Sequence, residues 1–100
     1  MTRIHRIHPV PARQGLFHLD VRHEDRGEAV IYVCGELDLA TSPVLRTCLS
    51  NLFAADTFRT LVVDLSAAPF VDVGAANLLL DAHRHATERG ASLSLTGCNA

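Results

Sequence analysis

Residues 61–80 (LVVDLSAAPFVDVGAANLLL) change their hydrophobic periodicity partway through, and this change limits the chain to folds that alternate strands with helices. The segment opens with the β-branched run LVV, which is typical of a strand buried on both faces of a parallel sheet. Pro69 prevents a helix from continuing out of that run, and the apolar spacing becomes helical from Ala75 onward. The segment therefore predicts a strand, a loop and a helix, in that order.

Asp72 lies where this loop meets the helix. Its carboxylate is placed to accept a hydrogen bond from the backbone N–H of Gly74 or Ala75, as the N-cap residue of a helix does. A negative charge there also suits the positive end of the helix dipole. We therefore expect this turn to take part in the function of the protein.

The length and composition predict one domain without a membrane-spanning segment. One hundred residues leave room for a single core, and a hydrophobic content of 48% with 20% charged residues is ordinary for a globular protein. No apolar stretch approaches the roughly 20 residues of a membrane helix, and the N-terminus lacks the apolar segment of a signal peptide. We therefore expect a cytoplasmic protein that does not associate with a membrane.

The cysteines and the charges argue against several functional classes. Cys34, Cys48 and Cys98 are odd in number and have no CxxC spacing, which favours neither a disulfide framework nor a zinc site. Nine arginines, no lysine and a formal net charge of -2 give no basic footprint for nucleic acid. The sequence therefore predicts no metal, no cofactor and no nucleic-acid partner.

The N-terminal part of the chain predicts an arm followed by a hairpin. Residues 1–14 are basic and contain two prolines, so they are expected to form a flexible arm. In residues 17–21 apolar side chains alternate with polar ones, which predicts a strand with one wet face and His18 directed to solvent. The turn signal DRG then leads to residues 29–34, which predict a second strand, antiparallel to the first.

Two helices and a last strand follow. Ser42 as N-cap and Pro43 at the first helical position predict the start of a helix. Residues 74–89 predict a second helix, and residues 92–96 alternate like a strand with one exposed face. The inward side of the second helix is expected to carry Ala75, Leu79, Ala82 and Ala86. Since strand–helix–strand crossovers are overwhelmingly right-handed, the pattern predicts an α/β fold, with a mixed, largely parallel sheet and helices packed on it.

Two loops, residues 36–41 and 66–73, leave the carboxyl ends of the parallel strands. Open α/β sheets place their binding sites at this edge. Asp38 and Asp72 are therefore expected to be neighbours there. For each carboxylate, bonding within its own turn is an alternative to contact with a partner.

The segments GELDLATSP and LVVDLSAAPFVDVGAANLLL resemble the two motifs of the STAS domain family, the anti-sigma factor antagonists of bacteria. The resemblance covers about residues 16–97 and assigns a STAS-like domain to residues 15–100. It implies that the chain is not an enzyme. It implies instead a regulator that sequesters an anti-sigma factor, typically a histidine-kinase-like ATPase that phosphorylates the antagonist, and so controls sigma-factor-dependent transcription. The partner contacts that it implies are Glu36, Asp38, Thr41, Asp72, Val73, Gly74 and Asn77.

Two features depart from the family pattern. Gly74 occupies the position that the family phosphorylates, and its neighbour Val73 has no hydroxyl, so phosphorylation in this turn is not expected. Family members usually continue past the last strand into a further helix, whereas this sequence ends at Ala100. We therefore expect the last family helix to be missing, and the apolar face that it leaves open to be covered by self-association or by another partner.

Two other functional classes remain as alternatives. Asp64 at the end of a buried strand indicates a phospho-acceptor receiver-like domain, but a receiver needs a lysine that this chain lacks. A small nucleotide- or anion-binding domain would use the helix N-terminus around Gly74. No glycine-rich phosphate loop, nucleophile–base pair or metal cluster in the sequence supports that second alternative.

Overall fold

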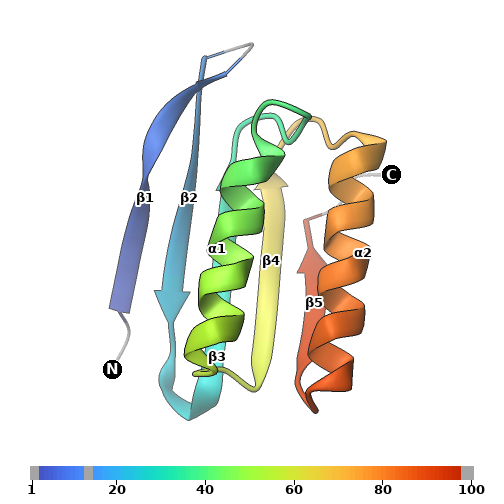
Figure 1. Cartoon of the computed structure of the whole chain (residues 1–100). Coiled ribbons are helices and arrows are strands. Elements are labelled where there is room, and N and C mark those ends of the chain that lie inside the picture. Colours follow the sequence, from blue (N-terminus) through green and yellow to red (C-terminus); the bar gives the residue numbers. More distant parts are fainter. Residues whose placement is uncertain (1–2, 13–14, 98–100) are drawn as a thin grey trace.

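The computed structural model describes residues 3–12 and 15–97, and in these residues five strands form one sheet in chain order, β1-β2-β3-β4-β5 (Figure 1). A short 3-10 turn, Asp25–Gly27, connects β2 to β3. The strands and helices are β1 (Arg3–Ala12), β2 (Gly15–His23), β3 (Glu28–Cys34), α1 (Ser42–Ala55), β4 (Thr60–Ala67), α2 (Val73–Glu88) and β5 (Ser92–Thr96).

The connections between the strands put both helices on one face of the sheet. The β1–β2 and β2–β3 pairs are antiparallel, and the β3–β4 and β4–β5 pairs are parallel. Each parallel pair is joined through a helix, and right-handed crossovers that step the same way across a sheet place their helices on the same face. Figure 1 shows α1 and α2 on one side of the sheet, where they contact each other. The predicted mixed α/β fold is thus confirmed.

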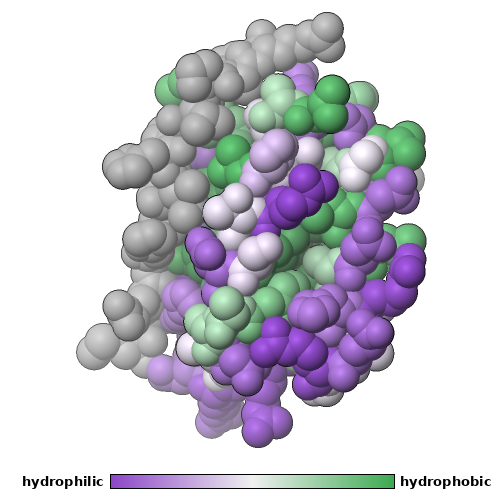
Figure 2. Space-filling model, viewed as in Figure 1, coloured by the Kyte–Doolittle hydropathy of each residue, from purple (hydrophilic) through white to green (hydrophobic). Residues whose placement is uncertain are grey.

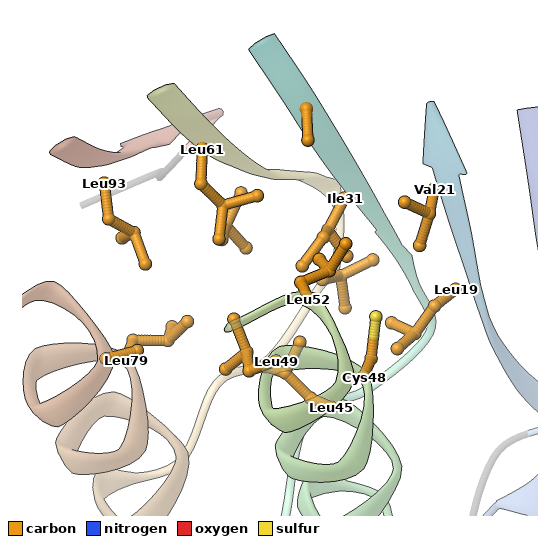
Figure 3. Close-up of a cluster of buried hydrophobic side chains, with 14 of the residues drawn as sticks. Leu19, Val21, Ile31, Leu45, Cys48, Leu49, Leu52, Leu61, Leu79 and Leu93 are labelled. Carbon is orange, nitrogen blue, oxygen red and sulfur yellow. The ribbon is translucent and has the colours of Figure 1, made fainter. Parts of the chain in front are cut away.

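The hydrophobic core lies between the sheet and the two helices (Figure 3). In β2 the inward residues Phe17, Leu19 and Val21 are buried, and the positions between them are more exposed. Each fully buried aliphatic or phenylalanine side chain of such a core contributes about 1.5–3 kcal/mol relative to an exposed one. Cys48 of α1 packs among these side chains, and burial raises the pKa of its thiol to about 11. Cys48 is therefore a neutral, apolar member of the core.

The helix α2 confirms the helix predicted for residues 74–89, but it begins and ends one residue earlier. The Asp72 carboxylate accepts a hydrogen bond from Ala75 N at 2.8 Å, so Asp72 is the N-cap as predicted. The predicted inward positions are all buried: Ala75, Leu79, Ala82 and Ala86.

The helix α1 begins at Ser42, so the N-cap position falls on Thr41 and the prediction of Ser42 as N-cap is wrong by one residue. The Thr41 side chain makes no capping bond to the helix; its hydroxyl bonds to the preceding loop instead. Pro43 lies in the first turn, as the second residue of the helix and not the first as predicted. The helix begins one residue earlier than predicted because hydrogen bonds of the loop, and not the Ser42 hydroxyl, define this end of the helix.

The N-terminal segment differs from the predicted flexible arm. Residues Arg3–Ala12 form β1, which pairs with β2 at the edge of the sheet. The register of this pairing shifts between Ile7 and Val10. Proline is tolerated on an edge strand or at a bulge, so the prolines that indicated an arm are compatible with a strand.

The strand β4 differs from the predicted strand buried on both faces. Its residues alternate between buried and more exposed positions, and Val62 is only partly buried between the buried Leu61 and Val63. The topology explains the difference, because both helices cover the same face. Val62 therefore lies on the face of the sheet that the helices do not cover, where the fold does not require an apolar side chain.

Other expectations concern the ends of the chain and the membrane. The expected absence of a last family helix refers to residues after β5, of which the structure describes only Gly97. Cys98 also lies outside the described residues. Neither α1 nor α2, the helices of the described part, is long and apolar enough to cross a membrane.

Candidate protein-binding surface

The loops that follow β3 and β4 are bonded to each other. Leu37 and Val71 form an isolated parallel bridge. In this bridge Leu37 N donates to Phe70 O at 2.8 Å, and Asp72 N donates to Leu37 O at 3.0 Å. The Leu37 side chain is fully buried and anchors the bridge in the core. Asp38 therefore follows directly after a residue whose carbonyl is bonded to the Asp72 backbone.

Asp38 folds its loop around its own carboxylate. Asp38 Oδ1 accepts hydrogen bonds from the backbone N–H groups of Ala40 at 3.0 Å and of Thr41 at 3.1 Å, an arrangement known as an Asx-turn. The Thr41 hydroxyl accepts from Asp38 N at 2.9 Å and donates to Glu36 O at 2.7 Å. These bonds hold the loop in one conformation without help from a partner.

Thr41 is not placed for the partner contact that the resemblance implies. Its side chain is fully buried, so it cannot touch a partner in this conformation. A buried hydroxyl needs hydrogen-bond partners, and Thr41 finds them in Glu36 and Asp38. Thr41 is thus a positioning residue that supports the Asp38 turn.

The first turn of α2 presents Val73, Gly74 and Asn77 to solvent. Val73 and Asn77 are four residues apart, so they lie on the same side of the helix. A Cβ built on Gly74 would lie 3.6 Å from Asp72 Oδ1, which is ordinary van der Waals contact. Gly74 is also not among the glycines with positive φ. The backbone therefore does not require a glycine at this position.

Exposed apolar side chains lie on the same two loops and on the helix start. Leu39 is 87% exposed, Val73 is 77% exposed and Phe70 is 52% exposed. Figure 2 shows hydrophobic side chains at the end of the molecule where these loops lie, whereas the opposite end is mainly hydrophilic. The prediction from sequence did not include Leu39 or Phe70. An apolar residue inside each loop of the carboxyl edge is the sequence signal that could have identified these two residues.

Apolar groups beside charged ones are typical of a surface that docks a partner. We call the following set the loop surface: Glu36, Asp38, Leu39, Phe70, Asp72, Val73, Gly74 and Asn77.

A groove of about 600 Å³ opens beside the loop surface. It lies between the β4–α2 loop and the end of β5, and its apolar lining includes Phe70, Leu79 and Leu95. Leu95 is 43% exposed. Phe70 belongs to both the groove and the loop surface, so one partner could contact both. The predicted self-association through an exposed apolar face stays a prediction.

Asp64, which indicated the receiver-like alternative, is engaged in a local turn. Ser66 N donates to Asp64 Oδ1 at 2.8 Å. Hydrogen bonds from the Ser66 side chain and backbone hold the pKa of Asp64 below its usual range. Asp64 is therefore ionised at neutral pH, and its own turn supplies hydrogen bonds to the carboxylate.

These features define a class of protein, a small α/β domain with helices on one face of a mixed sheet and two bridged loops at the carboxyl edge of its parallel strands. Residues 18–100 match the model of the STAS domain. The chain therefore belongs to the STAS domain family.

Solved structures with a similar fold include two anti-sigma factor antagonists. The anti-sigma factor antagonist SpoIIAA in its unphosphorylated form is 20% identical, with a TM-score of 0.71 over 82% of this chain and 74% of that chain. An anti-sigma factor antagonist from Mycobacterium paratuberculosis is 25% identical, with a TM-score of 0.65 over 86% of this chain and 70% of that chain.

The fold also occurs as a small part of a much longer chain. The murine Solute Carrier 26 family member A9 anion transporter is 24% identical, with a TM-score of 0.62, over 78% of this chain but only 13% of the transporter chain. No curated protein sequence matches this chain. The match to the STAS domain model thus establishes the family of this chain.

Proposed function

We propose that this chain is an anti-sigma factor antagonist, a protein-binding regulatory module without catalytic activity. It sequesters an anti-sigma factor in the cytoplasm and so controls sigma-factor-dependent transcription. Membership of the STAS domain family and the similarity to two structures of anti-sigma factor antagonists support this role. The partner that the family resemblance implies is an ATPase of the histidine-kinase-like class.

One observation carries the proposal, the backbone bridge that joins the two loops of the carboxyl edge. The bridge and the Asp38 turn hold in one conformation the backbone that carries two carboxylates and three exposed apolar side chains. A preorganised surface loses less conformational entropy when it binds, so more of the contact energy appears as affinity. The loop surface therefore fits a docking role.

In this proposal the partner is not released by phosphorylation of the turn at the start of α2. In the family a phosphate on a hydroxyl there adds about -1.5 to -2 charges beside a carboxylate, which repels a partner. In this chain the corresponding positions are Val73 and Gly74, and neither carries a hydroxyl. The complex is therefore expected to persist while the partner turns over ATP.

A charge placed on the loop surface tests the docking role. The partner is first recovered from native cell extract on the immobilised chain and identified, and we expect an anti-sigma factor. Its dissociation constant is then measured for the parent chain and for Val73→Asp. The substitution removes one of the exposed apolar contacts and puts in its place a charge that must be desolvated at the interface, and we expect at least about tenfold weaker binding. An acidic residue in the first turn of a helix does not harm the fold.

The matched control is Thr57→Asp. Thr57 is exposed and lies between α1 and β4, at the end of the sheet away from the loop surface (Figure 1). Thr57→Asp adds the same charge as Val73→Asp, and we expect it to bind the partner with the affinity of the parent chain. Equal affinity for the parent and Val73→Asp, with circular dichroism showing a native fold, would place the partner surface elsewhere.

A further inference from the structure

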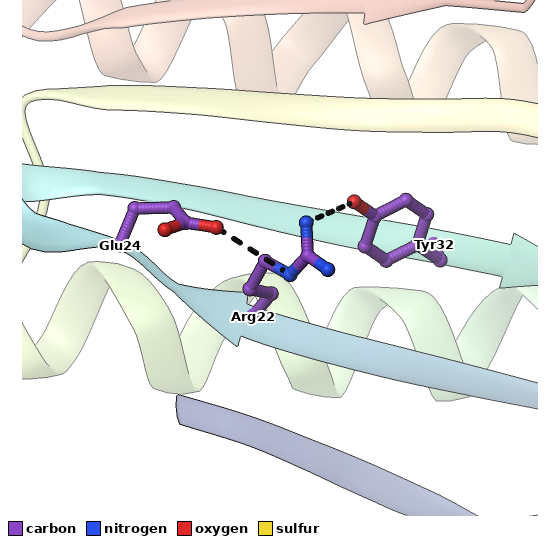
Figure 4. A network of polar contacts seen from close by, with 3 residues as sticks. All are labelled: Arg22, Glu24 and Tyr32. Atoms are coloured by element: carbon purple, nitrogen blue, oxygen red, sulfur yellow. Dashed lines mark hydrogen bonds and ion pairs between the residues drawn. The ribbon is translucent and has the colours of Figure 1, made fainter. Parts of the chain in front are cut away.

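The face of the sheet opposite the helices carries polar side chains that the loop surface does not use. In β2 the residues Phe17, Leu19 and Val21 point into the core, so the alternate positions His18, Asp20 and Arg22 lie on the other face. Figure 4 shows this face from the outside, with Arg22 in front of the strands and the helices behind them.

On this face His18 and Cys34 are direct partners across the β2–β3 pair. Asp20 is two residues further along β2 and therefore shares their side of the sheet. The ligand atoms of His18, Asp20 and Cys34 all lie within 4.8 Å of one another. His18 Nε2 is 3.7 Å from Asp20 Oδ2. An imidazole, a carboxylate and a thiol thus converge on one point above the sheet.

We propose that His18, Asp20 and Cys34 form a binding site for a zinc-type divalent cation. Tetrahedral zinc with ligand bonds of about 2.0–2.3 Å separates its ligand atoms by roughly 3.3–3.7 Å. The distance between His18 and Asp20 already falls at the upper end of that range. Atoms now up to 4.8 Å apart reach it by a movement of about 1 Å, which small side-chain rotations supply. Water takes the fourth position.

The chemistry and accessibility of the three groups fit this cation. Imidazole and thiolate ligands favour zinc over the harder magnesium and calcium ions. The side chains of His18 and Asp20 are 24% and 20% exposed, and Cys34 is partly buried, so the site opens to solvent on one side. On binding, the Cys34 thiol releases its proton to solvent and the metal–sulfur bond forms. His18, expected to point to solvent, lies on the face away from the helices and is partly exposed, beside the two other potential ligands.

Arg22, a cation beside the site among the described side chains, is already partnered. Arg22 donates to Tyr32 Oη at 3.2 Å and its Nε lies 3.4 Å from Glu24 Oε1, as the dashed lines in Figure 4 show. Glu24 therefore offsets the charge of Arg22 next to the proposed site. Cys34 is also the last residue of β3, directly before the loop that carries Asp38. A metal held there would tie β2 to β3 at the base of the loop surface.

A Co²⁺ titration of the reduced full chain, followed by absorption spectroscopy, tests this site. A thiolate bound to Co²⁺ gives an intense charge-transfer band in the near ultraviolet. We expect this band to saturate at one Co²⁺ per chain and to disappear when Zn²⁺ displaces the cobalt. Cys34→Ser should abolish the band. His18→Gln and Asp20→Asn should keep the thiolate and weaken Co²⁺ binding by at least about tenfold, since even loss of an outer-shell partner weakens metal sites about 10- to 100-fold.

Cys48→Ala is the matched control. Cys48 is buried in the core, so its removal should leave the band and the affinity for Co²⁺ unchanged. Circular dichroism verifies that each variant is folded. The proposal is overturned if the parent chain shows no band, or if the band survives in Cys34→Ser. It is also overturned if folded His18→Gln and Asp20→Asn both bind Co²⁺ as tightly as the parent chain does.

Discussion

The backbone N–H of Asp72 donates to the carbonyl oxygen of Leu37 at 3.0 Å, and this bond joins the two loops of the carboxyl edge. Each of these two residues also has a second anchor. Leu37 is buried in the core, and Asp72 caps α2 through Ala75 N. The loop surface is therefore tied to the core on one side and to a helix on the other, which holds its backbone in one conformation.

The first prediction separates the capping role of Asp72 from its charge. Asp72→Ala removes the acceptor for Ala75 N and should lower the free energy of unfolding by about 0.5–2 kcal/mol. Asp72→Asn keeps a side-chain oxygen and should be less destabilised. Both variants lose the negative charge, so both should bind the partner more weakly. Urea denaturation and binding titrations measure the two effects. Equal destabilisation by Asn and Ala would contradict the capping role.

The second prediction concerns the buried hydroxyl of Thr41. Thr41→Val keeps the shape but leaves Asp38 N and Glu36 O without this partner, which should lower the free energy of unfolding by about 1–3 kcal/mol. Thr41→Ser keeps the hydroxyl and should lose less. Because the hydroxyl of Thr41, and not its methyl group, contributes hydrogen bonds to the Asp38 turn, partner affinity should fall in Thr41→Val and be retained in Thr41→Ser. A Ser variant that binds as poorly as the Val variant would show that the methyl group, and not the hydroxyl, supports the loop.

The third prediction follows from the lowered pKa of Asp64. Because its folded-state pKa lies below the unfolded-state value of about 3.9, the ionised carboxylate stabilises the fold at neutral pH. This contribution is present above the unfolded-state pKa and is lost as the pH falls through the folded-state pKa. Asp64→Asn should therefore flatten the decrease of unfolding free energy below about pH 4. Denaturation curves at several pH values check this, and an unchanged pH dependence would contradict it.

The sequence predicted those parts of the fold that local patterns determine. The spacing of Ala75, Leu79 and Ala82 predicted α2, and the position of Asp72 before that stripe predicted its N-cap. The right-handed crossover rule then predicted that loops 36–41 and 66–73 share one edge of the sheet. All of these signals reside in a few neighbouring residues or in a general rule of topology.

The parts that the sequence did not predict depend on contacts between distant segments. β1 exists through its pairing with β2, and its prolines gave the opposite local signal. The burial of Thr41 depends on how its loop closes over the core, which no local pattern indicates. Likewise the convergence of His18 with Cys34 arises from the register of the β2–β3 pair and has no CxxC-type spacing.

Restoring a hydroxyl at Gly74 makes the absence of phosphorylation testable. A Cβ there meets only Asp72 Oδ1, at an ordinary contact distance, so Gly74→Ser and its control Gly74→Ala should both fold. Replacing glycine where the backbone permits it should raise the free energy of unfolding by about 0.4–1 kcal/mol. With an anti-sigma partner and magnesium ATP, Gly74→Ser should gain one phosphate, whereas Gly74→Ala should gain none. A phosphate on the Ala variant would show that another residue is the acceptor.

The lifetime of the complex in the presence of magnesium ATP shows whether phosphorylation releases the partner. The parent chain is mixed with its anti-sigma partner and ATP, and dissociation is followed together with the intact mass of the chain. We predict that the parent chain stays bound and keeps its mass, because Val73 and Gly74 offer no acceptor, and that Gly74→Ser is phosphorylated and released. Dissociation of the parent chain together with the gain of one phosphate would show instead that phosphorylation releases this chain from its partner.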